Sequence, residues 1–195
     1  MQDEALYPKK DITVPTLDHA SLLMFLSIMM KKKDCKFYQM DFPGAYLKAD
    51  LETEIYMRIN KPTVDVLNES HPEIIPDIRD DGTLISKIQK VIYGLKESGK
   101  LFRDRSVEVL REFGLEQLES HPCIFSKKLP NGKYLFACIY VDDVLLASNE
   151  YDAVVECKNH CDKEFPGIAL VHTVGKPISF LGMSILFDYD NLIIR

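Results

Sequence analysis

The stretch KYLFACIYVDDVLLAS, residues 133–148, decides the fold of this chain. Two β-rich apolar runs, residues 134–141 and 144–147, are separated only by Asp142 and Asp143. This pattern predicts a tight β-hairpin with two carboxylates at its tip. Carboxylates about 5 Å apart repel each other by about 3 kcal/mol at an effective dielectric constant of about 20, so they need a proton, solvent or a cation. An Asp-Asp pair is most often a surface turn, and only a further acid nearby favours a metal site.

That further acid is Asp41, which directly follows a short run, CKFYQM, that can form a strand. Pro43 and Gly44 then turn the chain. A strand ending in Asp41 beside the hairpin would bring three carboxylates to one edge of a sheet. Three oxygen donors without a nearby His or Cys suit Mg²⁺ or Mn²⁺. Two such ions about 3.5–4 Å apart are the arrangement used for in-line phosphoryl transfer.

Four segments of the chain, taken in order, resemble the motif blocks of copia-type LTR-retrotransposon reverse transcriptases. They are QMDFPGAYLKADLETEIYM (39–57), KVIYGLKESGKLF (90–102), IYVDDVLLAS (139–148) and FLGMSI (180–185). The resemblance extends over about residues 16–195 and implies an RNA-directed DNA polymerase. It implies two Mg²⁺ or Mn²⁺ ions bound by Asp41, Asp142 and Asp143, with the backbone carbonyl of Phe42 as a further ligand.

The same resemblance implies which residues contact the substrates. The incoming nucleotide would lie against Gly44, Ala45, Tyr46 and Glu97, with the Tyr46 ring under the sugar, where a 2′-hydroxyl would collide with it. Without the resemblance, Tyr46 would be interpreted as a core aromatic. The template and primer would contact Tyr93, Gly94, Lys96, Tyr140, Val141, Phe180, Leu181 and Gly182.

Two positions depart from the family pattern. The family usually has Gln where this chain has Glu97, and a carboxylate there would repel a triphosphate unless it is protonated, paired with Lys96 or Lys100, or turned away. The family usually has Trp shortly after the YGLK block, where this chain has Phe102 and no Trp anywhere. A Phe fills much of the same volume, so the fold is expected to persist.

The order of the predicted elements indicates an α+β fold with the ferredoxin-like βαββαβ pattern, an antiparallel sheet and helices on one face. The resemblance implies that this is a polymerase palm with a partial fingers region. Residues 1–10 are expected to be a loose terminus and residues 61–83 a surface insertion with no clear period. Helices are predicted at 17–33, with Thr16 or Asp18 as N-cap, at 98–113 before Gly114, and at 150–165. Strands are predicted at 35–40, 54–59, 84–92, 122–127, 133–141 and 144–147, with a last hairpin from 178–187 and 192–194.

Length and composition predict a single domain. The chain has 195 residues, 46% of them hydrophobic, which is enough for one core. We expect residues 1–35 to form a tail and a fingers-side helix, residues 36–195 to form the palm, and the thumb, connection and RNase H regions to be absent. The net charge of −6 is unusual for a nucleic-acid enzyme. Two basic groups could nevertheless track a phosphate backbone or be solvated faces: Lys31, Lys32, Lys33 and Lys36, and then Lys87, Lys90, Lys96, Lys100, Arg103 and Arg105.

The cysteines and the apolar runs argue against a disulfide-bonded secreted protein, a zinc protein and a membrane protein. Five cysteines without a secretory context predict free thiols in a reducing compartment. Cys157, His160, Cys161 and His172 could form a zinc site, but spacing of four favours a buried helix face for the two cysteines. The longest apolar stretch, residues 22–30, is about half of a membrane span, so no membrane is expected as a partner.

Three functions remain open. The first is a polymerase acting on an RNA or DNA template with primer and on deoxynucleoside triphosphates, beside the integrase and RNase H of one polyprotein. It would act in the cytoplasm, within a virus-like particle, or in the nucleus. The second is an inactive relic of the same fold that binds nucleic acid or a partner, which Glu97 and the acidic balance favour. The third is a palm-like nucleotide cyclase, which the Tyr46 and YGLK blocks disfavour.

Overall fold

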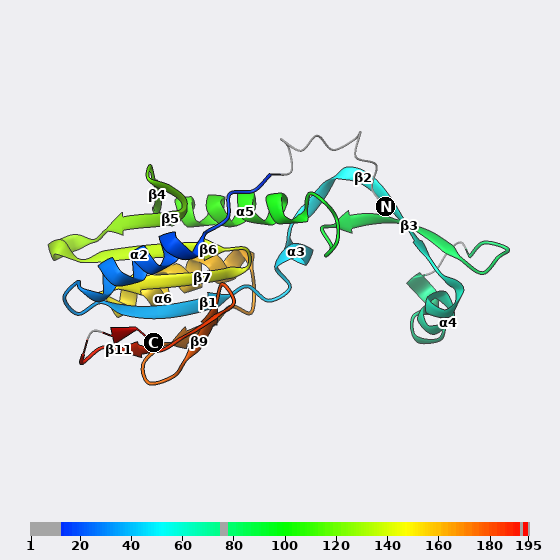
Figure 1. The fold of residues 1–195 in the computed structure, drawn as a ribbon. Helices are drawn as coiled ribbons and strands as arrows, with labels where there is room; N and C mark the ends of the chain where they lie inside the picture. The colour runs from blue at the N-terminus through cyan, green and yellow to red at the C-terminus, as the bar shows by residue number, and fades with distance from the viewer. Residues whose placement is uncertain (1–12, 75–77, 192, 195) are drawn as a thin grey trace.

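The computed structural model describes residues 13–74, 78–191, 193 and 194, and is built around an antiparallel sheet (Figure 1). The strands lie in the order β4-β5-β6-β7-β1-β8. Every pair of neighbours is antiparallel. The strands are β1 (Lys36–Asp41), β4 (Glu116–Leu118), β5 (His121–Lys128), β6 (Tyr134–Tyr140), β7 (Asp143–Ser148) and β8 (Ala169–His172). The predicted hairpin at 133–148 is therefore confirmed, as β6 and β7.

Helices cover both faces of this sheet (Figure 1). On one face, α5 (Ser98–Glu112) and α6 (Tyr151–Glu164) pack on a core that includes Met40. On the other, α2 (His19–Met30) packs on a core that includes Phe37. Our expectation of helices on one face only was wrong. The central strands are apolar on both sides, so each side needs a cover.

The three long helices begin and end close to where the sequence predicts. Asp18 caps α2, since its carboxylate accepts a hydrogen bond of 3.0 Å from the Ser21 N–H. Gly114, with φ of +91°, ends α5 in a left-handed conformation that favours glycine. None of the described helices combines the length and the apolar character needed to cross a membrane.

A two-stranded ribbon extends away from the sheet (Figure 1). It consists of β2 (Asp50–Ile59) and β3 (Leu84–Lys90), follows the short α3 (Ala45–Lys48), and carries α4 (Lys61–Ser70) and η2 (Pro72–Ile74) at its far end. We expected a surface insertion without a clear period at 61–83, and part of this segment is the helix α4. Asn60 caps the helix through an Oδ1 that accepts from the Thr63 N–H, and Pro62 fits the first turn, where no helical donor is needed.

The C-terminal segment forms two short hairpins instead of the single long one predicted. The first joins β9 (Ile178–Phe180) to β10 (Met183–Ile185), and the second joins β11 (Phe187–Asp188) to β12 (Ile193–Ile194). Leu181 and Gly182 have φ values of +51° and +71°, which make a tight turn inside the predicted strand. Residues 1–10 and Leu192, on which two expectations fell, lie outside the described residues.

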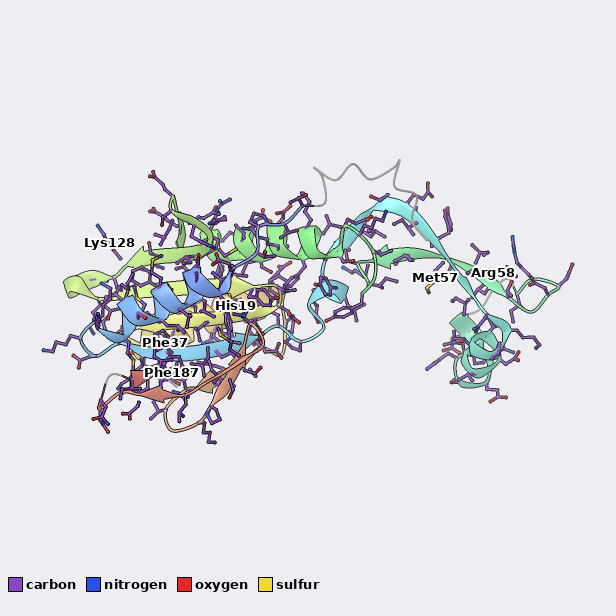
Figure 2. All side chains as sticks on the ribbon, viewed as in Figure 1. His19, Phe37, Met57, Arg58, Lys128 and Phe187 are labelled. Atoms are coloured by element: carbon purple, nitrogen blue, oxygen red, sulfur yellow. The ribbon has the colours of Figure 1, made fainter. Side chains whose placement is uncertain are left out.

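Aromatic packing joins the C-terminal hairpins to the sheet. The rings of Phe37 in β1 and Phe187 in β11 stack with centroids 4.3 Å apart. Figure 2 labels these two residues, which lie near each other. Phe25 of α2 meets Phe37 edge-to-face at 6.4 Å. The same face buries Cys35, Cys123 and Cys138, while Cys157 and Cys161 are buried on the opposite face; all five thiols are free.

Candidate functional site

Three acids meet at one end of the sheet. Asp41, the last residue of β1, pairs in register with Asp143, the first residue of β7. The N–H of Phe42 donates to the carbonyl of Asp142 at 3.3 Å, so the 42/142 pair is hydrogen-bonded and the 41/143 pair is not. Side chains of non-hydrogen-bonded pairs approach most closely and point to the same face. Asp142 lies in the turn after Val141, which has φ of +54°. The structure thus brings together the three acids singled out in the sequence.

The acids influence each other electrostatically. Burial raises the pKa of the Asp143 carboxyl above its ordinary value of 3.8. The hydrogen bond from Gln39 opposes this shift, and the charges of Asp142 and Asp41 add to it. A cation between these carboxylates would relieve both the repulsion and the cost of burial.

The carboxylates of Asp41, Asp142 and Asp143 are ligands of the kind that a hard divalent ion prefers, although their oxygens do not converge on one point. In the described part of the chain, no group of three or more His, Cys, Asp or Glu is placed so that it could hold a metal ion. Carboxylates are nevertheless the ligands that Mg²⁺ and Mn²⁺ prefer. The zinc alternative is not supported, because Cys157 and Cys161 pack in the hydrophobic core as a helix face predicts, and His172 Nε2 faces the Tyr151 hydroxyl at 3.2 Å.

Three of the residues predicted for the nucleotide, Gly44, Ala45 and Tyr46, lie just after Asp41 in the chain, at the base of the ribbon. Gly44 has φ of +62° and precedes Ala45, the first residue of α3. The ring of Tyr46 packs edge-on against Tyr93 at 4.5 Å and against Phe102 at 5.7 Å. Burial raises the pKa of the Tyr46 hydroxyl, and the charge of Asp142 adds to that effect. Tyr46 is therefore both a core-packing residue and a neighbour of the acids.

Glu97, the departure from the family pattern, is the N-cap residue of α5. Its side chain is buried at the N-terminal end of α5, next to the half-buried Lys96. The sequence allowed three settings for this carboxyl: protonated, paired with Lys96 or Lys100, or turned away from the nucleotide.

The residues predicted to contact template and primer fall into two groups. Tyr93, which is 64% exposed, Gly94 and Lys96 precede α5 on the ribbon side. Tyr140, Val141, Phe180, Leu181 and Gly182 form the second group, in which the rings of Tyr140 and Phe180 lie 6.5 Å apart. This second group joins the acidic turn to the β9–β10 hairpin.

Gln39 was missed in the sequence. Its Nε2 donates to Asp143 Oδ1 at 3.1 Å and to the carbonyl of Ser179 at 2.9 Å. The signal was available, since residue 39 shares a strand face with residue 41. The β9 partner, 140 residues away, could not be foreseen.

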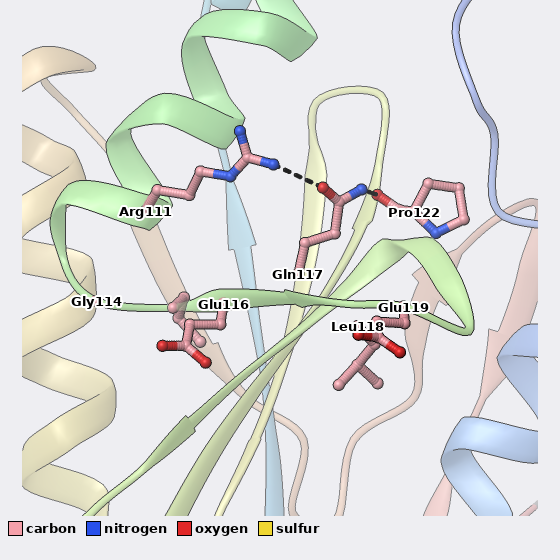
Figure 3. Close-up of a pocket in the computed structure, with 8 residues that line it drawn as sticks. Arg111, Gly114, Glu116, Gln117, Leu118, Glu119 and Pro122 are labelled. Carbon is pink, nitrogen blue, oxygen red and sulfur yellow. Dashed lines mark hydrogen bonds between the residues drawn. The ribbon is translucent and has the colours of Figure 1, made fainter.

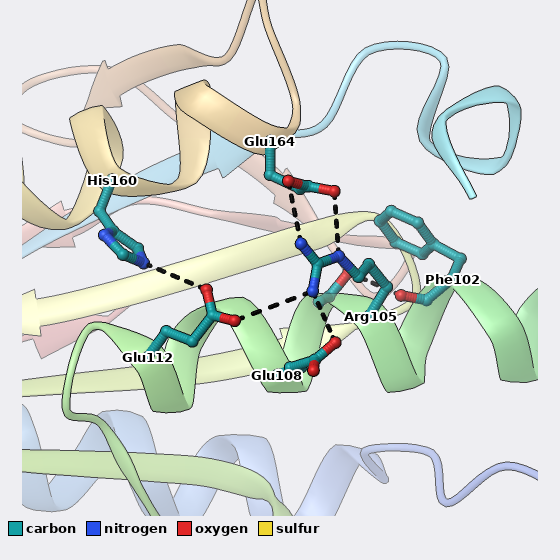
Figure 4. Close-up of polar contacts among 7 residues, drawn as sticks. Phe102, Arg105, Glu108, Glu112, His160 and Glu164 are labelled. Atoms are coloured by element: carbon teal, nitrogen blue, oxygen red, sulfur yellow. Dashed lines mark hydrogen bonds and ion pairs between the residues drawn. The ribbon is translucent and has the colours of Figure 1, made fainter. Parts of the chain in front are cut away.

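Arg105, in the middle group of cations, is held in an ion-pair network between α5 and α6. Arg105 of α5 donates to Glu164 of α6 at 3.0 Å and to Glu108 at 2.6 Å, and these bonds raise its pKa (Figure 4). Glu112 completes the cluster and also faces His160, at 3.9 Å each. The network ties α5 to α6, so Arg105 is a structural residue and does not present a free charge to a phosphate backbone.

A hollow of about 640 Å³ lies at the other edge of the sheet, by β4 (Figure 3). Gln117 spans it, accepting a hydrogen bond from Arg111 Nη2 at 2.7 Å and donating to the carbonyl of Pro122 at 2.8 Å. Glu116 and Glu119 give its rim an acidic character. The strand order separates it from the three acids, so it is not part of the candidate site.

Known proteins resemble this chain over most of its length. The family model described as reverse transcriptase (RNA-dependent DNA polymerase) matches residues 4–194. The retrovirus-related Pol polyprotein from transposon TNT 1-94 of Nicotiana tabacum is 24% identical over 90% of this chain and 12% of its own length. The truncated transposon Ty1-A Gag-Pol polyprotein of Saccharomyces cerevisiae is 28% identical over 71% of this chain and 10% of its own. The chain belongs to the reverse transcriptase (RNA-dependent DNA polymerase) family, and to its copia-type LTR-retrotransposon members.

Proposed function

We propose that this chain is the nucleotide-transferring core of a retrotransposon reverse transcriptase, which joins a deoxynucleotide to the 3′-hydroxyl of a primer on an RNA or DNA template. The observation that carries the proposal is the register of Asp41 against Asp143, with Asp142 in the adjoining turn. Family membership supplies the class of reaction. Its relatives are named Pol and Gag-Pol polyproteins, which supports a polyprotein context, and we propose integrase and RNase H regions as its neighbours there.

The topology supports a palm. Strands β1, β6, β7 and β8, with α5 and α6 between them in the chain, lie in the order β6-β7-β1-β8, which is that of a ferredoxin-like βαββαβ sheet. In our proposal residues 36–195 form this palm, with residues 61–83 as a surface insertion between the two strands of the β2–β3 ribbon, and residues 1–35 form a tail and a fingers-side helix. The fold alone would not assign the activity, since this pattern hosts many functions.

The acids would supply the metal ligands. Asp41, Asp142, Asp143 and the carbonyl of Phe42 would hold two Mg²⁺ or Mn²⁺ ions. Bound there, the ions would lower the pKa of the primer hydroxyl and stabilise the leaving pyrophosphate. The sheet fixes Asp41 and Asp143 through backbone pairing, and the buried Phe42 ring, against Phe102 and Phe165, anchors the chain after Asp41.

The aromatic wall beside the acids would orient the nucleotide. The Tyr46 ring, held between Tyr93 and Phe102, would lie under the sugar and exclude a 2′-hydroxyl by collision. Replacing Tyr46 with Val, in a protein fused to homologous fingers and thumb regions, should admit ribonucleotides and retain deoxynucleotide incorporation. Equal discrimination in the variant and its parent would return Tyr46 to a packing role.

An inactive relic is the second candidate. It is favoured by buried Glu97 where the family usually has Gln, and by acids that are not gathered into a cage in the described residues. Such a protein would keep the sheet and bind nucleic acid without extending a primer.

Primer extension separates the two. We expect little extension by the chain alone, since productive binding needs basic groups and a clamp. We expect measurable extension by a fusion to homologous fingers and thumb regions, loss of extension with Asp142→Asn, and a gain with Glu97→Gln. A fusion that stays inert with Gln at position 97 would establish the relic.

A further inference from the structure

We propose that Gln39 is a positioning residue that couples Asp143 to the β9–β10 hairpin, an inference that rests on the proposed function for its meaning in catalysis. One amide group contacts both elements: Nε2 lies 3.1 Å from Asp143 Oδ1 and 2.9 Å from the Ser179 carbonyl oxygen. A movement of the β9–β10 hairpin would therefore displace the Gln39 amide and change its contact with the Asp143 carboxylate.

The chemistry of the contacts requires a nitrogen with at least two N–H donors here. A backbone carbonyl can only accept hydrogen bonds, so the atom facing Ser179 must be a donor. The same atom faces Asp143, and an NH₂ group carries two N–H donors. Gln39 thus uses both donors, one toward each element. A glutamate in this place would offer a carboxylate to two acceptors, and a methionine would offer no donor at all.

The location makes the coupling useful. Gln39 shares the face of β1 with Asp41, and Asp143 lies opposite Asp41. The hairpin carries Phe180 and the tight turn at Leu181, and the Phe180 ring neighbours Tyr140, next to the acidic turn. The group proposed to contact the primer and the group proposed to bind metal are therefore joined through one side chain. A primer seated on the hairpin would be fixed relative to Asp143.

The chain offers a matched control in Gln117. This residue also bridges two elements, from Arg111 of α5 to the Pro122 carbonyl, and its Nε2 donates at 2.8 Å (Figure 3). It lies on β4, at the opposite side of the sheet from β1. Gln117→Met therefore makes the same chemical change without touching the acids.

Hydrogen exchange of the full chain tests the link without any need for activity. Without metal, Gln39→Met should speed exchange of the protected amides in residues 178–185 by about tenfold, the effect of losing one net hydrogen bond. Gln117→Met should leave these amides unchanged, and α5 in the same sample reports on the global fold. Unchanged exchange at 178–185 in Gln39→Met would overturn the inference. If Gln39→Met also speeds exchange in α5, the Gln39→Lys variant, which keeps N–H donors, is the deciding test. Restored protection of residues 178–185 in Gln39→Lys would support the link, and unrestored protection would refute it.

A second arm adds Mn²⁺ alone. Ion binding should fix Asp143 and slow exchange at 178–185 in the parent, and Gln39→Met should lose this response while Gln117→Met keeps it. An ion that raises the melting temperature of the parent but leaves its hairpin unchanged would overturn the coupling and leave the proposed function standing. An ion that does not bind the parent would refute the metal site instead, and the metal-free exchange would still decide the role of Gln39.

Discussion

The sheet and the β2–β3 ribbon are built on opposite principles. Each strand in the middle of the sheet has neighbours on both sides and a core on both faces, and Phe37 and Leu145 are completely buried. The ribbon has two strands only, and Tyr56 and Met57 are 57% and 41% exposed. Figure 2 shows Met57 and Arg58 far from the Phe37–Phe187 stack. Since an isolated two-stranded ribbon is marginally stable in water, the sheet must supply the folding free energy and the fixed geometry of the acids.

The largest expected effect comes from the core of the sheet. Phe37→Ala removes a fully buried ring that stacks on Phe187 and should lower the free energy of unfolding by about 3–5 kcal/mol. Tyr56→Ala, on the ribbon, should change it by less than about 0.5 kcal/mol. Urea denaturation measures both values. Similar losses at the two positions would show that the ribbon shares the core's stability.

Metal binding should stabilise the sheet by a smaller amount. At an Mn²⁺ concentration of about 100 times Kd, binding to the folded state adds about 2.7 kcal/mol, so the melting temperature should rise. Asp142→Asn should remove most of this gain, whereas Asp81→Asn, an acid at the ribbon end, should preserve it. A wild-type melting curve that is unchanged across millimolar Mn²⁺ would contradict the site at the sheet.

Local unfolding of the ribbon should be separable from global unfolding. Val64 is the buried residue of α4, and Val64→Ala removes about 1–1.5 kcal/mol of packing. We expect faster limited proteolysis within residues 61–70 and an unchanged urea midpoint for the whole protein. A midpoint that falls with Val64→Ala would mean that the ribbon and sheet unfold together.

The smallest effect concerns acid stability. Hydrogen bonds from Ser21 lower the pKa of Asp18, the N-cap of α2, to about 2 from its ordinary value of 3.8. Because the folded pKa is the lower one, the stabilisation is complete above pH 3.8 and is lost as pH falls toward 2. Asp18→Asn keeps a capping oxygen but cannot titrate, so its melting temperature should fall less steeply across this range.

A ribbon acid provides the counterpart to that experiment. Hydrogen bonds from Thr83 lower the pKa of Asp81 in the same direction. If only the sheet determines global unfolding, Asp81→Asn should leave the acid branch of the stability curve unchanged. A flattened curve in this variant would assign part of the global stability to the ribbon.

Local patterns predicted much of this structure. The apolar runs around Asp142 and Asp143, the capping Asp18 and the helix-ending Gly114 are signals confined to a few residues, and each marks the element it predicted. The proximity of Asp41 to the hairpin was also predicted, from a strand that ends in an acid and from the resemblance of the motif blocks to a known family.

The failures arose where distant contacts or single backbone angles decide the structure. A helix on the second face of the sheet could be recognised only from the side chains that it covers. The turn at Leu181 depends on a positive φ at a non-glycine residue, which local propensity opposes. Gln39 bonds to Asp143 and Ser179, which lie 104 and 140 positions further along the chain, and no local pattern predicts such contacts.

The buried cysteines allow unfolding of the sheet to be measured separately from motions of the ribbon. All five thiols lie in the sheet region, and residues 50–90, which contain the ribbon, have none. Burial raises the pKa of the Cys138 thiol, which keeps it protonated and unreactive toward alkylating reagents in the native state. A thiol-reactive dye would therefore label the protein only when the sheet opens, and motions of the ribbon would not affect the labelling. The labelling rate would thus report the rate of core unfolding in unmodified protein.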